Sequence, residues 1–230
     1  VLADTPSKKA LPDVIEMRGH NARTNVNFFK DLKMVLSEKY FWAIAIWFIF
    51  RGGALFGFFG LWAGPYLMET YRLTKYTAGN ILSMIAFAMI LLSPVLGHMS
   101  DKTLSSRKKV LLYTSILNSL CWLTMLIFFE HLSILWLYVI FFIMGITISS
   151  VGTIAIVATK ELFPQDMAGT SMGTMNVFPF IGGIIFQPLI GYVLDRTGKI
   201  QGIYPASAYR YMLWLLFITS VFALISIAFS

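Results

Sequence analysis

Six long apolar stretches alternate with short polar connections along this chain of 230 residues. None of them carries the polar stripe that a helix shows at the surface of a soluble protein. Each stretch is long enough to cross about 30 Å of hydrocarbon as a helix. The pattern therefore predicts an all-α integral membrane protein with six transmembrane helices, at about 40–67, 78–98, 110–129, 133–158, 170–193 and 210–229.

The first 39 residues differ from the rest because they are polar and basic. They contain no apolar segment of the kind found in a signal peptide. Residues 28–39 are amphipathic, and we expect them to form a short helix on the membrane surface. The chain is thus divided into a cytoplasmic lead-in, 1–39, and a transmembrane bundle, 40–230.

Composition supports a membrane protein and excludes several other classes. Hydrophobic residues make up 57% of the chain and charged residues 13%, against about 25% charged in soluble domains. The net charge of +7 therefore indicates membrane topology and not nucleic-acid binding. Cys121 is the single cysteine, and no Cys/His cluster suggests a metal or another cofactor. No phosphate-binding loop or catalytic triad is present, so we expect no enzyme activity.

The distribution of Lys and Arg predicts the orientation of the spans. Twelve of the 18 basic residues lie in the lead-in and in the connections on the same side of the membrane, and five lie on the opposite side. Arg51 is the remaining one, inside the first span. Because basic loops stay in the cytoplasm, both termini are expected there. The lack of glycosylation sites favours a bacterial inner membrane.

A motif of the form Pro-x-x-Gly-x-x-x-Asp-[Lys/Arg] occurs at the ends of the second and fifth spans. The copies are Pro94, Gly97, Asp101 and Lys102, and Pro188, Gly191, Asp195 and Arg196. An offset of 94 residues relates them and superimposes the first three spans on the last three. Since spans two and five cross in opposite directions, this is a 3+3 inverted repeat, which is typical of transporters.

With these features the chain resembles the C-terminal six-helix half of a bacterial member of the major facilitator superfamily (MFS). Residues 97–102 with 107–109 are similar to the cytoplasmic loop motif of that superfamily, although 103–106 separate the two parts. Residues 161–164 with 168–173 are similar to the connection between its tenth and eleventh helices. Residues 61–67 are similar to the end of its seventh helix.

The resemblance implies a symporter or antiporter that moves a small polar solute by alternating access. Its partners are the solute, the lipid bilayer and an N-terminal six-helix half that lies outside this chain. The resemblance also implies that Asp101 caps a helix of that half in a cytoplasmic gate, supported by Gly97, Lys102 and Arg107. The alternative function is a six-span scaffold or receptor-like subunit that does not transport.

Arg51 is the sharpest candidate for contact with a solute. It lies 11 residues past Tyr40, which places it about 16 Å deep by helical rise, near the middle of the bilayer. A charge at that depth usually faces a cavity, a partner or a ligand. One hypothesis is that Arg51 binds an anionic group through forked hydrogen bonds. The other is that it pairs with a carboxylate of the absent half or with backbone carbonyls.

Uncharged polar residues inside the spans are further candidates for substrate binding. They are Ser150, Asn176 and Gln187. Such residues also hydrogen-bond to neighbouring helices or to their own backbone, and this alternative applies to all three. The expected solute is a small polar organic molecule, and Arg51 favours an anion.

Overall fold

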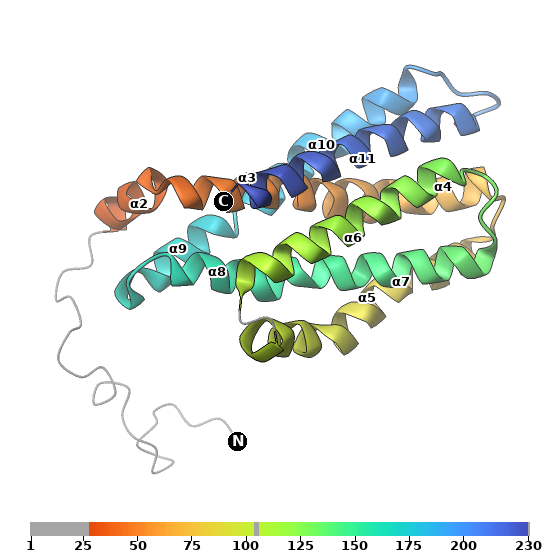
Figure 1. Cartoon of the computed structure of the whole chain (residues 1–230). Helices are drawn as coiled ribbons and strands as arrows, with labels where there is room; N and C mark the ends of the chain where they lie inside the picture. The colour runs from red at the N-terminus through yellow and green to blue at the C-terminus, as the bar shows by residue number, and fades with distance from the viewer. Residues whose placement is uncertain (1–27, 104–105, 230) are drawn as a thin grey trace, which may run out of the picture.

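The structure is a computed structural model that describes residues 28–103 and 106–229, and the regular elements among them are helices (Figure 1). The lead-in up to residue 27 lies outside the described residues. The elements are α2 (Phe28–Ser37), α3 (Lys39–Gly52), η2 (Gly53–Trp62), α4 (Ala63–Thr70), α5 (Lys75–His98), η3 (Met99–Thr103), α6 (Arg107–Ile127), α7 (Ile134–Ser150), η4 (Val151–Ala155), α8 (Ile156–Glu161), η5 (Gln165–Met167), α9 (Ala168–Met175), α10 (Phe178–Asp195) and α11 (Ala206–Ala228).

Six stretches built from these elements are long and apolar enough to cross a membrane, which confirms the predicted fold class. They are Lys39–Thr70, Lys75–Thr103, Arg107–Ile127, Ile134–Glu161, Gln165–Asp195 and Ala206–Ala228. Lipid offers no hydrogen bonds to the backbone, so a helix, which pairs most of its N–H and C=O groups internally, is the favoured conformation of each stretch. The fifth and sixth stretches begin directly after Pro164 and Pro205, a few residues before the apolar runs of the sequence.

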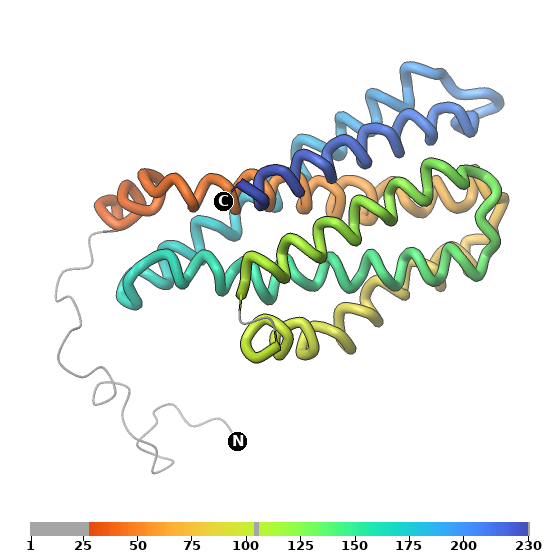
Figure 2. The backbone as a smooth tube through the Cα atoms, in the orientation of Figure 1, coloured from red at the N-terminus to blue at the C-terminus, as the bar shows by residue number. Residues whose placement is uncertain are grey.

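The long helices run side by side in one bundle (Figure 2). α5 packs against α7, α10 against α3 and η2, and α11 against both α3 and α6. Large side chains fill two core clusters along the bundle. Phe58 and Trp122, with ring centres 5.0 Å apart, belong to one cluster, and Trp47 belongs to the other. The first span thus contributes to the whole length of the core.

Two glycines allow α3 and α10 to approach closely. A Cβ atom on Gly52 would lie 2.2 Å from the carbonyl oxygen of Pro179, and one on Gly182 would lie 2.0 Å from that of Ile49. No other residue type fits at these separations, because the added carbon would overlap the facing backbone. The crossing therefore depends on both glycines.

The inverted repeat is visible in the helices. Pro94 lies within α5 and Pro188 within α10, and these two helices run in opposite directions (Figure 1). Shifted by the offset of the repeat, η2 covers positions 147–156, which include η4. Both segments are π-helical. Because π-helical turns occur frequently at functional sites, the matching pair makes spans one and four candidates for a functional role.

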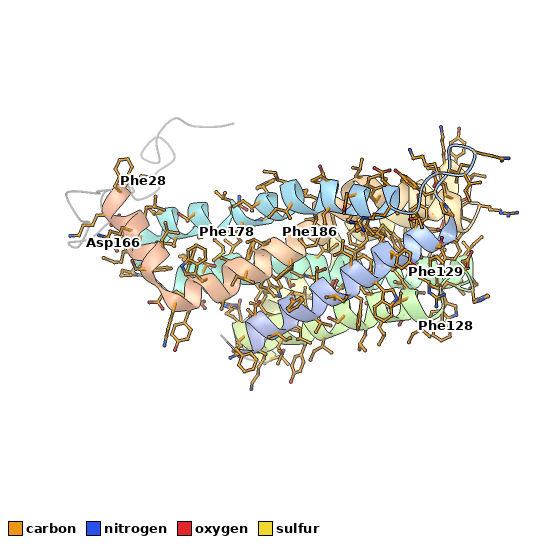
Figure 3. The ribbon with its side chains drawn as sticks, turned by 90° about the horizontal axis from the view of Figure 1, so that it is seen from above. Phe28, Phe128, Phe129, Asp166, Phe178 and Phe186 are labelled. Atoms are coloured by element: carbon orange, nitrogen blue, oxygen red, sulfur yellow. The ribbon has the colours of Figure 1, made fainter. Side chains whose placement is uncertain are left out.

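α2 continues beyond the apolar bundle, where the sequence predicts a short helix, and its location on the membrane surface stays a prediction. Phe28 and Phe29 are 53% and 79% exposed, whereas Val35 is buried, and Figure 3 shows Phe28 projecting from the end of the helix. The helix ends at Ser37. Glu38 then caps α3, because its carboxylate accepts a hydrogen bond from the backbone N–H of Tyr40 at 3.2 Å.

Candidate functional site

The fifth span is interrupted between α9 and α10. α9 ends at Met175 and α10 begins at Phe178, so that a turn separates them at Asn176 and Val177. The interruption has a local cause, because Pro179 has no N–H group to offer the carbonyl of Met175. Interrupted spans are the usual place for solute sites in transporters with inverted repeats.

One face of this interrupted span is not covered by other parts of the described chain. Asn176, Phe180, Ile184 and Gln187 are all exposed, and their spacing places them on one side of the helix. We call these four residues the Asn176 face. Its two amides lie about 16 Å apart along the helix. Polar amides that are exposed to lipid are costly, so the face is expected to meet water, solute or protein.

The first span makes contacts that position two residues of the Asn176 face, Phe180 and Gln187. The Nε2 of Gln187 donates a hydrogen bond to the carbonyl oxygen of Phe56 at 3.0 Å, and the indole N–H of Trp62 donates to the carbonyl oxygen of Gln187 at 3.2 Å. The rings of Phe56 and Phe180 are stacked, with their centres 5.0 Å apart. Since Phe56 and Trp62 belong to η2, this π-helical segment places a ring and an amide together.

Arg51 lies apart from this face, inside the bundle. It is 3% exposed, and its guanidinium carbon lies 5.6 Å from the centre of the Trp47 ring. Its Nε and Nη2 have no hydrogen-bond partner among the described residues. In an arginine side chain, these two nitrogens can donate two parallel hydrogen bonds to one carboxylate. Arg107 uses the same pair on Glu161, at 3.2 and 3.0 Å.

Ser150 takes part in a contact between two helices. Its hydroxyl donates to the carbonyl oxygen of Thr147 at 2.7 Å and accepts from the hydroxyl of Thr114 at 3.1 Å, which ties α7 to α6. The residue is fully buried. The structure therefore separates Ser150 from Asn176 and Gln187, which lie on the exposed face.

The loop motif after the second span forms an ionic network at the end of the bundle that carries α2. Arg107 pairs with Asp101 and with Glu161, and it donates to the hydroxyl of Ser100 at 2.9 Å. The network connects η3, α6 and α8. The residues inserted between the two parts of the motif do not prevent the pairing of Asp101 with Arg107.

The other members of this motif lie beside the network. Gly97 is in the last turns of α5, with open space where a side chain would be, and Lys102 is exposed on η3. The capping role expected for Asp101 involves a helix outside this chain and stays a prediction. Glu161 was missed as a partner of Arg107, because hydropathy only locates it at the end of a span.

We expect Arg107→Ala to loosen this end of the bundle. The pairs are partly exposed, so the loss of stability should be about 1 kcal/mol or less. A cysteine placed at buried Leu96, in a Cys121→Ser background, should nevertheless react with a small thiol reagent about fivefold faster. Lys109→Ala, at an exposed neighbour outside the network, is the control. Equal labelling rates in the two variants would show that the network does not hold this end closed.

The second copy of the repeat motif lies at the opposite end and makes different contacts. Asp195 accepts a hydrogen bond from the hydroxyl of Tyr204 at 2.6 Å. This bond, together with burial, raises the pKa of Tyr204 to about 12. Arg196 donates to the hydroxyl of Tyr192 at 3.0 Å and lies over its ring. A Cβ atom on Gly191 would lie 3.2 Å from the ring of Trp62 in the first span.

Glu69 extends this cluster to the first and sixth spans. Its carboxylate accepts from the backbone N–H of Tyr204 at 3.0 Å and from the hydroxyl of Tyr209 at 2.8 Å. The sequence pattern gave no signal for these contacts, because the partners lie 135 and 140 residues away. The cluster therefore ties the first, fifth and sixth spans together at this end of the bundle, and only the fold reveals it.

Tyr209→Phe should lower the stability of the protein by about 2 kcal/mol, because it removes a hydrogen bond to a carboxylate at a fully buried position. Thermal unfolding in one detergent measures this effect. Tyr211→Phe on the same helix is the matched control, since Tyr211 is 59% exposed. If both variants unfold at the wild-type temperature, the Glu69 contact contributes nothing to stability.

The described side chains are suited to binding. They include two amides, stacked rings and the Nε and Nη2 atoms of Arg51. Among residues 28–103 and 106–229, no group of three or more His, Cys, Asp or Glu is placed to hold a metal ion. Such an arrangement can orient a polar solute through hydrogen bonds and apolar contact.

Comparison with known proteins shows the family. The family model of the Major Facilitator Superfamily matches residues 2–186. The probable galactarate/D-glucarate transporter GudP of Escherichia coli (strain K12) is 23% identical over 151 residues, and that of Pseudomonas putida is 27% identical over 165 residues. These matches cover 65% and 70% of this chain but 34% of each relative, so the chain spans about a third of their length. The chain belongs to the Major Facilitator Superfamily.

Proposed function

We propose that this chain forms six spans of a secondary transporter that moves a small hydroxylated organic anion by alternating access. Its family supports solute transport. Relatives in three bacteria, including Bacillus subtilis (strain 168), are named as probable galactarate/D-glucarate transporters. Those two solutes are sugar-derived carboxylates, and we extend this chemical class to the present chain.

The observation that carries the proposal is the Asn176 face. The carboxamides of Asn176 and Gln187 offer hydrogen-bonding groups to a hydroxylated solute at two separate places, about 16 Å apart along the helix. Between them, Phe180 stacked on Phe56 offers an apolar surface for the carbon chain. A face with this mixture, left exposed in a six-span bundle, is suited to the wall of a solute cavity between two bundles.

Arg51 supports an anionic solute. A buried cation acts over a longer distance in low dielectric than in water. A buried charge also needs compensation, and Nε and Nη2 find none among the described residues. A carboxylate of the solute meets this need if the bundle opens at η2, where a Cβ atom on Gly53 or Gly57 would meet Phe186 of α10 first. A carboxylate from a second bundle is the alternative.

The proposed cycle needs a partner bundle and a closing device. An N-terminal six-helix half, as a further part of the same transporter, would complete the cavity. The network of Asp101, Arg107 and Glu161 would help to close one end, and the solute would shift the balance between inward-open and outward-open states by binding them differently. We place both termini in the cytoplasm and the protein in a bacterial inner membrane, on the basis of the positive-inside rule.

This orientation predicts opposite labelling of two exposed lysines. In a Cys121→Ser background, Lys199→Cys should react with an impermeant thiol reagent added to intact cells, whereas Lys109→Cys should react only after the cells are opened. The reason is that the two positions lie at opposite ends of the spans. The reverse result would show that the topology is inverted.

The role of the Asn176 face is tested by comparing two phenylalanines. Phe180→Ala should weaken binding of a hydroxylated carboxylate such as galactarate about tenfold, because a stacked ring contributes about 1 kcal/mol or more. Phe222→Ala is the matched control: Phe222 is also 53% exposed and also stacks on a ring of the first span, that of Phe50. Equal affinities of the two variants would exclude the face as the solute site.

A further inference from the structure

The hydroxyl group of Ser119, in α6, lies inside the bundle without a hydrogen-bond partner among the described residues. The other serine and threonine residues of α6 behave differently. The hydroxyls of Thr114, Ser115 and Thr124 each donate to the backbone carbonyl four residues earlier, at 2.9, 2.7 and 2.8 Å. A buried hydroxyl without a partner is costly. The exception at Ser119 therefore indicates that its hydroxyl is directed at a group that this part of the chain does not supply.

Arg51 lies at the same level of the bundle as Ser119. The indole N–H of Trp47 donates to the hydroxyl of Ser115 at 2.8 Å, which joins α3 to α6. A ring contact between η2 and α6 follows farther along both spans. Spans one and three run in the same direction, because one crossing lies between them. Arg51 and Ser119 each follow the first contact by four residues, so both lie one turn beyond it on the side of the helix that makes the contact.

The indole N–H of Trp122 is a further unpartnered donor in this interval. Trp122 follows Ser119 by three residues, is fully buried and packs its ring against Phe58, and its Nε1 has no hydrogen-bond partner among the described residues. With Nε and Nη2 of Arg51, four N–H or O–H groups without partners thus lie between the first and third spans. Elsewhere in the described part of the chain, the hydroxyl of Thr70, at the end of α4, is in the same condition.

A carboxylate matches these four groups in number and in charge. Its two oxygens offer about four lone-pair positions, of which Arg51 takes two and the hydroxyl and indole groups take the others. Its negative charge also compensates the buried guanidinium. A water molecule accepts fewer hydrogen bonds, adds two donors of its own and leaves the charge of Arg51 uncompensated. The set of donors therefore favours a carboxylate over water.

We propose that Ser119 and Trp122 complete a carboxylate site with Arg51 between the first and third spans. The carboxylate belongs either to the solute or to a side chain of a second bundle, and the chemistry of the site is the same in both cases. The solute source rests on the proposed function, because it needs the opening of the bundle at η2. Arg51 supplies the charge, and Ser119 and Trp122 fix the direction of the bound group, so the site favours a planar anion with two oxygens over a chloride ion.

Equilibrium binding of galactarate to the intact protein, measured together with the melting temperature, tests the proposal. Ser119→Ala and Trp122→Phe each remove one donor and keep most of the packing. Each should weaken galactarate binding about tenfold, since hydrogen bonds to charged groups are among the stronger ones. Without galactarate, both variants should melt at or slightly above the wild-type temperature, because each loses a buried polar group that has no partner. Thr124→Ala, which removes a hydroxyl bonded to its own helix, is the control and should keep the affinity.

The two readouts distinguish the sources of the carboxylate. Lower affinity at an unchanged melting temperature assigns it to the solute. A lower melting temperature of both variants at unchanged affinity assigns it to a second bundle, and the site then stands while the solute role of Arg51 fails.

The proposal is overturned if neither readout changes in the folded variants. It is also overturned if chloride raises the melting temperature of the wild type as much as galactarate does. If Phe180→Ala weakens galactarate binding while neither readout changes in Ser119→Ala and Trp122→Phe, the proposed function stands and the carboxylate site alone fails.

Discussion

Arg51→Ala is expected to weaken binding of an anionic solute by about 2–5 kcal/mol, which is at least about 30-fold in affinity. The substitution removes the two nitrogens, Nε and Nη2, that have no hydrogen-bond partner among the described residues. Arg51→Lys should recover only part of the affinity, because an ammonium group keeps the charge but cannot form two parallel hydrogen bonds to a carboxylate. Equilibrium binding to the intact protein measures both variants.

The same two variants separate the two hypotheses for Arg51. If Arg51 pairs with a carboxylate of a second bundle, both variants should lose thermal stability before they lose affinity, because that carboxylate remains unpaired in the membrane. If it meets the solute, the folded variants should bind poorly and melt near the wild-type temperature in the absence of solute. Unchanged affinity in well-folded Arg51→Ala would show that Arg51 is not part of the solute site. The main physical reason to expect an anionic solute would then be lost.

Gly182→Ala is expected to destabilise the bundle by about 3 kcal/mol or more. The added Cβ atom would lie 2.0 Å from the carbonyl oxygen of Ile49, and the facing atom is backbone that no side-chain rotation can move away. α3 and α10 must therefore separate, which also disturbs the contacts of η2 that hold Gln187. The thermal unfolding temperature and the yield of monodisperse protein measure this effect.

Gly79→Ala is the matched control for this variant. Gly79 is also a helical glycine, in α5, but a Cβ atom there meets nothing within 4 Å. Alanine is a better helix former than glycine, so this variant should be as stable as the wild type or slightly more stable. If Gly182→Ala is equally well tolerated, the close crossing of α3 and α10 does not exist in the protein.

Hydropathy was sufficient to predict the six spans because lipid cannot form hydrogen bonds with the backbone. Lipid forces each apolar stretch into a helix, so the length of the run alone predicts the element. The offset of 94 residues between Pro94 and Pro188 predicted which spans are equivalent in the repeat, but not which spans pack against each other. Local backbone detail was not predictable in this way. The π-helical segment η2 packs against α10, and the sequence pattern of residues 53–62 gives no sign of the π-helical turns.

The candidate site was predictable only in part. The sequence singled out Asn176 and Gln187 as polar residues in hydrocarbon, but their common exposed face depends on the interruption before Pro179. The charge of Arg51 was predictable, but the neighbour that its side chain faces was not, since a helical residue at mid-span can face any neighbour. The contacts of Glu69 and Glu161 join distant parts of the chain, and only the packing of the helices brings them together.

Solute counterflow in proteoliposomes tests the central claim most directly. The intact protein is reconstituted into vesicles preloaded with unlabelled galactarate, and labelled galactarate is added outside. If the chain forms part of a transporter for hydroxylated organic anions, the vesicles should take up label transiently and saturably, D-glucarate should compete, and Phe180→Ala should reduce the uptake while Phe222→Ala does not. Folded protein that gives no more uptake than protein-free vesicles, for galactarate and for a panel of small organic anions, would contradict the claim.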